Sequence, residues 1–142
     1  MAEPQAEPPP AHAQEYFVVS MGLETWLYHD LLKEIHNLRE VVVDVRDKIK
    51  APPKGSRIKG ARYPDARVVA QIIIHEDFPL VVSNCEKVLE DRGIVVVGCK
   101  SGIRKAPTIA AAVERKSFNA YTVHCSLHQF TKTDMMLSLI HI

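Results

Sequence analysis

The chain has 142 residues, of which 46% are hydrophobic and 25% charged, and its formal net charge is +1. This length suits one domain, and this composition excludes a wholly disordered chain and any overall bias toward polyanions. The three cysteines, Cys85, Cys99 and Cys125, are odd in number and lack CxxC spacing, so we expect no disulfide framework, no metal and no cofactor. Free cysteines suit a reducing compartment, so we expect an intracellular, cytoplasmic protein. We also expect no membrane-spanning segment, because no apolar run approaches the ~18 residues needed to cross a bilayer.

Both ends of the chain are expected to lie outside the folded domain. Residues 1–14 are rich in Pro, Ala and Glu and lack the basic and apolar regions of a secretory signal, which predicts a disordered tail. The last six residues, LSLIHI (137–142), match one translated frame of a sequencing adapter, and we interpret them as read-through. A single domain is therefore predicted over residues 15–136.

The first half of this domain begins with strand and helix signals. Residues 15–22 form a β-branched and aromatic run that predicts a strand. Apolar residues then recur at helical spacing over 23–40, which predicts an amphipathic helix with Trp26 in the core. The continuous apolar run at 41–46, VVVDVR, is typical of a strand buried on both faces. Residues 47–65 contain three prolines and two glycines, and this predicts a loop.

The second half continues the alternation of helices and strands. Helices are predicted over 66–77, 79–92 and 106–118, and strands over 94–99 and 119–128. The alternation predicts an α/β fold, a small three-layer sandwich around a mainly parallel sheet of about four strands. In such sheets ligands bind outside the carboxyl ends of the strands.

One strand-to-helix turn, within GCKSGIRKAPTIAAAVE (98–114), has the composition of an anion-binding loop. A helix start presents backbone N–H groups and a positive dipole end, and glycine can adopt the positive φ that such a loop needs. An ordinary turn with solvated basic residues is the alternative. We expect the anion site to comprise Cys99, Lys100, Ser101, Gly102, Ile103, Arg104, Lys105 and Thr108, with Asp44, Arg46 and His124 facing it from neighbouring strand ends.

Cys99 raises the question of catalysis. A thiolate at a helix start beside cations is stabilised, as in cysteine phosphatases and sulfurtransferases, where Cys99 would be the nucleophile and Arg104 its anion ligand. The alternative is that Cys99 is a small buried side chain with no role in chemistry. The nearest downstream acid is Glu114, on the following helix, so no general acid stands within the loop. The sequence leaves the enzyme question open and favours binding without a catalytic residue.

Two families share parts of this pattern. Cys99-Lys-Ser-Gly-Ile-Arg104 resembles the CxxGxR active loop of single-domain rhodaneses, although Lys105 stands where those proteins usually have Ser. A wider resemblance, over about residues 15–130, is to the C-terminal domain of RapZ, the bacterial RNase adapter protein, and its stand-alone eukaryotic relatives. It is carried by Asp44-Val-Arg46, Pro52-Pro53, HEDFPLVV (75–82), GCKSGIRKAPTIAAAVE (98–114) and VHCSLH (123–128).

The RapZ resemblance implies binding of an amino-sugar phosphate and of small regulatory RNA. The family's His-Arg pair in the loop is Arg104-Lys105 here, which keeps the positive charge but changes the geometry offered to a phosphate. The chain has no GxxxxGK[ST] motif, so nucleotide hydrolysis is not implied. The expected partner is a phosphorylated small molecule or RNA, and a homo-oligomer is left open.

A basic segment offers further phosphate contacts. Between Arg46 and Arg67 there are eight Lys and Arg residues against two Asp. This segment could bind RNA phosphates or be a solvated loop. The candidate contacts are Lys54, Arg57, Lys59 and Arg62.

Overall fold

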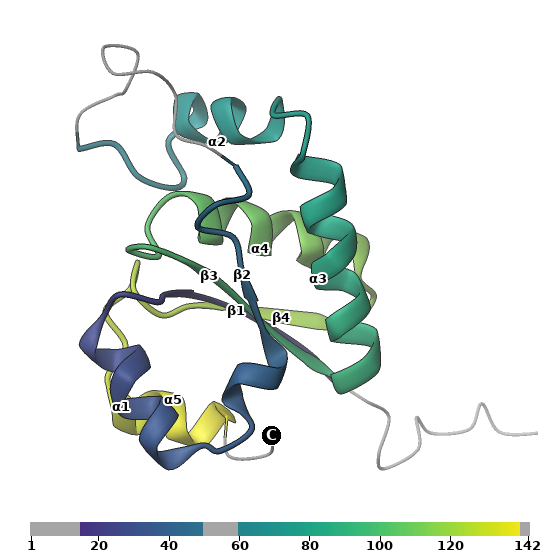
Figure 1. Ribbon diagram of the computed structural model, residues 1–142. Coiled ribbons are helices and arrows are strands. Elements are labelled where there is room, and N and C mark those ends of the chain that lie inside the picture. The colour runs from purple at the N-terminus through teal and green to yellow at the C-terminus, as the bar shows by residue number, and fades with distance from the viewer. Residues whose placement is uncertain (1–14, 50–59, 140–142) are drawn as a thin grey trace, which may run out of the picture.

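The structure, a computed structural model, describes residues 15–49 and 60–139 (Figure 1). In chain order its elements are β1 (Tyr16–Gly22), α1 (Trp26–Glu34), the 3-10 helix η1 (Leu38–Val41), β2 (Val42–Asp44), α2 (Ala66–Ile73), α3 (Phe78–Arg92), β3 (Ile94–Cys99), α4 (Lys105–Lys116), β4 (Ala120–His124) and α5 (Lys132–Leu139). The predicted tail, residues 1–14, lies outside the described residues.

The strands form one four-stranded parallel sheet with the order β2-β3-β1-β4. All four carboxyl ends therefore meet at one edge, where Gly22 is level with Cys99, Asp44 with Gly98, and Ser20 with His124. The α/β fold and the parallel sheet predicted from the sequence are confirmed.

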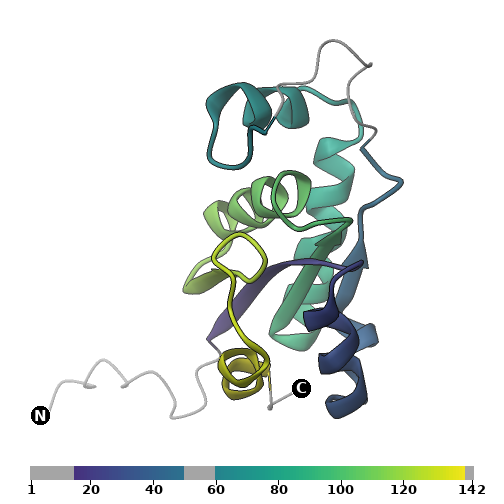
Figure 2. The same cartoon turned by 90° about the vertical axis from the view of Figure 1, so that its left-hand side faces the viewer.

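Helices cover both faces of the sheet (Figures 1 and 2). On one face α3 and α4 pack over Val18, Val95 and Val97, and α2 packs on α4. On the other face α1 and α5 pack over Val19 and Val96. The central strands β1 and β3 contribute to both cores because successive side chains of a strand point to opposite faces.

Local side-chain chemistry fixes the helix ends. The Thr25 hydroxyl accepts the Tyr28 N–H at 3.3 Å and caps α1, and Asp65 caps α2 by accepting the Arg67 N–H at 2.9 Å. Gly93, in the left-handed conformation with φ of 77°, ends α3. Thr and Asp at the start of a helix and Gly at its end are the residue types usually found at these positions.

The structure differs from the sequence prediction mainly at the ends of elements. The helix predicted over 23–40 is divided into α1 and η1, and Trp26, expected in the core, is 85% exposed. β2 ends at Asp44 because the Asp44 carboxylate accepts the N–H of Arg46 at 3.0 Å and turns the backbone. β4 ends at His124, where a turn closed by His128 N–H on the His124 carbonyl begins.

The helix α5 was not predicted from the sequence. This helix buries Met135 and Leu139 against α1 and Cys125, and Lys132 forms an ion pair with Glu34 at 2.8 Å. It includes residues 137–139, which the sequence analysis excluded from the domain.

Candidate functional site

The turn between β3 and α4 is shaped by Gly102. This glycine has φ of 77°, and its N–H donates to Sγ of Cys99 at 3.2 Å. A Cβ on Gly102 would collide with the backbone N of Gly22 and would lie 2.8 Å from the carbonyl carbon of Met21. Gly102 is thus required both for its conformation and for the close approach of the turn to β1, as the sequence predicted for its conformation.

The start of α4 has no side-chain cap. Arg104 occupies the cap position and makes no side-chain hydrogen bond to the helix's first N–H groups within the described part of the chain. The Thr108 hydroxyl is buried and donates to the Arg104 carbonyl at 2.8 Å, one turn earlier. The N–H groups of Lys105 and Ala106 belong to the first turn, where a helix supplies no acceptor of its own.

The side chains of Arg104 and Lys105, which end the loop, donate hydrogen bonds to backbone carbonyls of the protein. Nζ of Lys105 donates to the carbonyls of Val45, Arg46 and Ile49 at 3.1, 2.7 and 2.8 Å, which uses all three of its donors. Burial lowers the pKa of Lys105. Nε of Arg104 donates to the Ala61 carbonyl at 2.6 Å. Lys105 can therefore contribute charge to a ligand site but no free hydrogen-bond donor.

The remaining loop residues differ in exposure. Lys100 and Ser101 are exposed, and Arg104 is exposed beyond its bond to Ala61. Ile103 is half-buried, and its carbonyl accepts the Tyr63 N–H at 2.9 Å, which attaches the segment before α2 to the loop. Cys99 is only 3% exposed and belongs to the core on the α3 and α4 face.

His124 lies on the same face of the sheet as Cys99. Its Nδ1 is 2.7 Å from the hydroxyl of buried Ser20, and its ring lies 5.3 Å from Tyr63 and 5.8 Å from His128. Burial, followed by the charge of His128, lowers the pKa of His124. The sequence singled out His124 but not Ser20, which becomes its partner only through the strand register.

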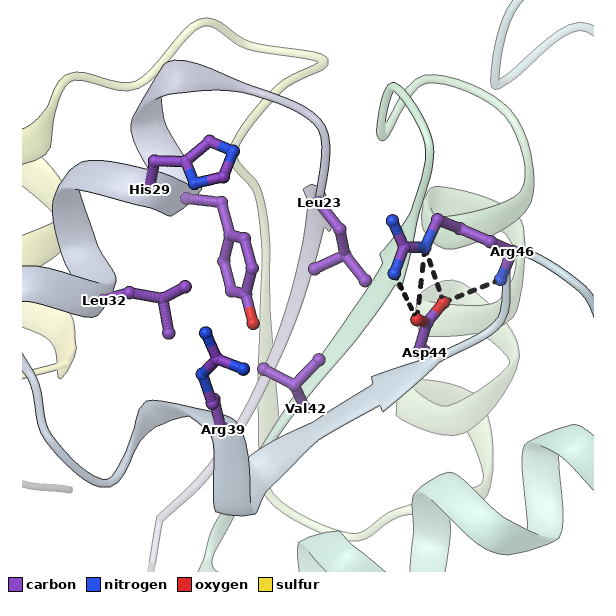
Figure 3. A pocket seen from close by; sticks show the side chains of 8 residues that line it. Leu23, His29, Leu32, Arg39, Val42, Asp44 and Arg46 are labelled. Atoms are coloured by element: carbon purple, nitrogen blue, oxygen red, sulfur yellow. Dashed lines mark hydrogen bonds and ion pairs between the residues drawn. The ribbon is translucent and has the colours of Figure 1, made fainter.

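Asp44 and Arg46 have a different environment from the one expected. Asp44 shares its face of the sheet with Val42, which packs in the core beneath α1, whereas Cys99 is on the opposite face. The Arg46 guanidinium holds the Asp44 carboxylate through Nε at 3.0 and 3.1 Å and Nη2 at 2.6 Å (Figure 3). These bonds lower the pKa of Asp44, and both charged groups line a pocket beneath α1. They also remain near the loop, because the charge of Lys105 helps to lower the Asp44 pKa and its Nζ donates to the Arg46 carbonyl.

The basic segment can be placed only in part. Lys54, Arg57 and Lys59 lie outside the described residues. Arg62 is described and exposed, one residue before Tyr63. Among the described residues, no group of three or more His, Cys, Asp or Glu side chains is arranged to hold a metal ion.

Comparison with known proteins adds no assignment. No protein-family model matches the chain, and no curated protein matches it. In the described ranges, no single helix has the length and apolar character to span a membrane; α2 and α3, joined at a 90° bend, reach that length and composition only when counted together. The site is therefore defined by its geometry, as a strand-to-helix loop at the carboxyl edge of a parallel α/β sheet.

Proposed function

We propose that the protein is a non-catalytic binding domain for a phosphorylated small molecule, held by the loop of residues 99–105. The observation that carries the proposal is the uncapped start of α4, which follows a basic loop at the ligand-binding edge of the sheet. N–H groups at a helix start attract anions through hydrogen bonds and through the helix dipole. The resemblance to the RapZ C-terminal domain points to the same ligand class.

Three kinds of group support anion binding at this loop. The backbone N–H groups of Lys105 and Ala106 begin the helix, the exposed Ser101 hydroxyl can donate, and Lys100 and Arg104 carry exposed positive charge. Lys105 adds a positive charge held in place by three carbonyls. Because phosphate esters carry one to two negative charges, this set is suited to a phosphate.

One observation favours a second candidate, a cysteine-dependent sulfurtransferase or phosphatase. The Gly102 N–H reaches Sγ of Cys99, and such a bond stabilises a thiolate more than a thiol. The burial of Cys99 opposes this candidate, because a nucleophile must reach its substrate. Turnover of thiosulfate or of an aryl phosphate that disappears in Cys99→Ser would establish the enzyme in place of the binding domain.

The proposal is tested by calorimetric titration with glucosamine 6-phosphate, inorganic phosphate and unphosphorylated glucosamine. We expect the two phosphate compounds to bind and to raise the melting temperature, and glucosamine to do neither. Lys100→Gln/Arg104→Gln should weaken phosphate binding about tenfold or more, because charge-assisted hydrogen bonds contribute about 1.5–3 kcal/mol each.

The matched control lies at the other end of the same helix. Arg115→Gln/Lys116→Gln also removes two exposed positive charges from α4 and should leave phosphate binding unchanged. Equal weakening by both double variants would indicate a general charge effect and contradict the loop site. Binding of short RNA with a steep salt dependence, weakened by Arg62→Ala, would favour the RNA form of the proposal over a small molecule.

A further inference from the structure

A pocket of about 400 Å³ lies beneath α1, on the face of the sheet opposite Cys99 (Figure 3). It opens between α1, η1 and β2, and this volume falls within the range of small-ligand sites. Its lining residues are Leu23, Tyr28, His29, Leu32, Arg39, Val42, Asp44 and Arg46.

The two arginines of the pocket differ in how their charge is balanced. Arg46 is bound by Asp44 and also lies 3.5 Å from a carboxylate oxygen of Glu24. No acidic side chain pairs with Arg39 among the residues that the structure describes. Figure 3 shows the Arg39 guanidinium pointing into the pocket, across from the Asp44–Arg46 pair. Arg39 is therefore the cation of the pocket that has donors left for a ligand.

The rest of the lining comprises three aliphatic side chains, Tyr28 and the imidazole of His29. Leu23, Leu32 and Val42 contribute aliphatic surface, and Leu23 is itself almost fully buried. The hydroxyl of Tyr28 is near enough to Arg39 for the arginine to oppose the rise in its pKa that burial causes. The phenol thus keeps its proton at neutral pH and can donate a hydrogen bond beside Arg39.

We propose that this pocket binds a small monocarboxylate with a compact apolar body, its carboxylate on Arg39 and its apolar part on Leu23, Leu32 and Val42. A guanidinium matches a carboxylate through two parallel N–H donors. A dianion is disfavoured, because Asp44 in the lining and Glu24, which pairs with Arg46, both carry negative charge. This site goes beyond the proposed phosphate loop and shares none of the loop's residues.

The test is a titration of the full chain with phenylacetate, followed by calorimetry and by backbone amide NMR. Phenylacetamide, which has the same shape without the charge, is the matched ligand. We expect phenylacetate to bind saturably, with amide shifts concentrated in residues 23–46, and phenylacetamide to bind at least tenfold more weakly.

Arg39→Gln should raise the Kd of phenylacetate about tenfold or more and leave that of phenylacetamide unchanged. Arg39 is exposed, so the variant should fold, and the exposed Arg115→Gln on α4 is the matched control with an unchanged Kd. The proposal is overturned if phenylacetate shows no saturable binding, shifts the amides of 99–105 in place of 23–46, or binds Arg39→Gln as it binds wild type. Phosphate binding at the loop is measured separately, so a pocket that binds no phenylacetate leaves the phosphate proposal intact, and amide shifts in 99–105 would show that the carboxylate occupies the loop site.

Discussion

Lys105 illustrates how position alters the role of a single residue. In the sequence it is one of three cations in a loop, and each of them could face an anion. In the structure its ammonium joins the loop to the chain after β2 through carbonyls 56 to 60 residues away along the sequence. Such a contact has no local signature, because carbonyl acceptors exist at every residue.

His124 gives a pH-dependent prediction at the same scale. Its pKa is lowered from 6.5, first by burial and then by His128, so the folded state takes up the proton less readily than the unfolded chain. Well above pH 6.5 the residue is neutral in both states and has no effect on the free energy of unfolding. As the pH falls below 6.5 toward the folded-state pKa, the unfolded chain gains more protons and the free energy of unfolding decreases.

Urea unfolding at pH 7.5 and 5.5 measures this effect. We expect wild type to lose stability between the two pH values and His124→Gln to lose less. His29→Gln removes an exposed histidine and should lose as much as wild type. An unchanged loss of stability in His124→Gln would show that other groups cause it.

At the scale of elements, the β3–α4 turn depends on one glycine. Gly102 and Gly60 have nearly the same φ, 77° and 74°, but a Cβ meets the backbone of β1 at Gly102 and nothing within 4 Å at Gly60. Gly60→Ala should cost about 1–2 kcal/mol, the penalty of a left-handed alanine. Gly102→Ala should cost on the order of 2–5 kcal/mol, because overpacking adds about 1–3 kcal/mol.

Chemical denaturation of the two variants checks this difference, and phosphate titration of Gly102→Ala shows whether the loop still binds. Equal destabilisation by the two substitutions would mean that the turn can move away from β1. In that case the close approach of Gly102 to Gly22 would not define the loop.

The sequence predicted elements better than it predicted faces. The strands were found because β-branched runs stand at 15–22, 41–46 and 94–99, and the helix over 79–92 because Pro79 and Gly93 mark its ends. The run at 41–46 was expected to be buried on both faces, but β2 is a half-buried strand at the edge of the sheet. α5 was missed because its last residues, 137–139, were interpreted as read-through, and because it is short, with its buried residues Met135 and Leu139 one turn apart. Its stability depends on α1 and Cys125, which no local pattern reveals.

Sequence also did not reveal that two of the predicted site residues lie on opposite faces of the sheet. Asp44 and Cys99 both stand at strand ends, and the sequence predicted that they would face one site. The register sets Asp44 level with Gly98, one residue before Cys99, so the two side chains point to opposite faces. The apolar runs of β2 and β3 do not specify the register of their pairing to within one residue, so the sequence could not show which face each side chain takes.

At the scale of the whole molecule, the sheet separates two candidate sites that share one edge. The loop of residues 99–105 lies on the side of α4, and the pocket with Arg39 lies beneath α1. Both depend on the packed sheet, since Gly102 rests on β1 and Val42 belongs to β2. Unfolding of the domain should therefore abolish both sites together.

The three thiols report on this packing. Cys85, Cys99 and Cys125 are all buried, and burial raises the pKa of Cys85 and of Cys125 to about 12. The thiolate is the reactive form, so the raised pKa slows the reaction of these two thiols.

We expect a thiol reagent such as DTNB at pH 8 to react slowly with all three in the native protein and rapidly in urea. All three thiols belong to the cores, and the informative residue is Cys99, because its Sγ accepts the Gly102 N–H inside the proposed binding loop. A single fast thiol that disappears in Cys99→Ala would mean that the loop opens around its sulfur, as a nucleophile requires, and would favour the enzyme. A binding loop with a structural cysteine predicts that all three thiols of the wild type react slowly. It also predicts that the two remaining thiols of Cys99→Ala react at the same slow rate.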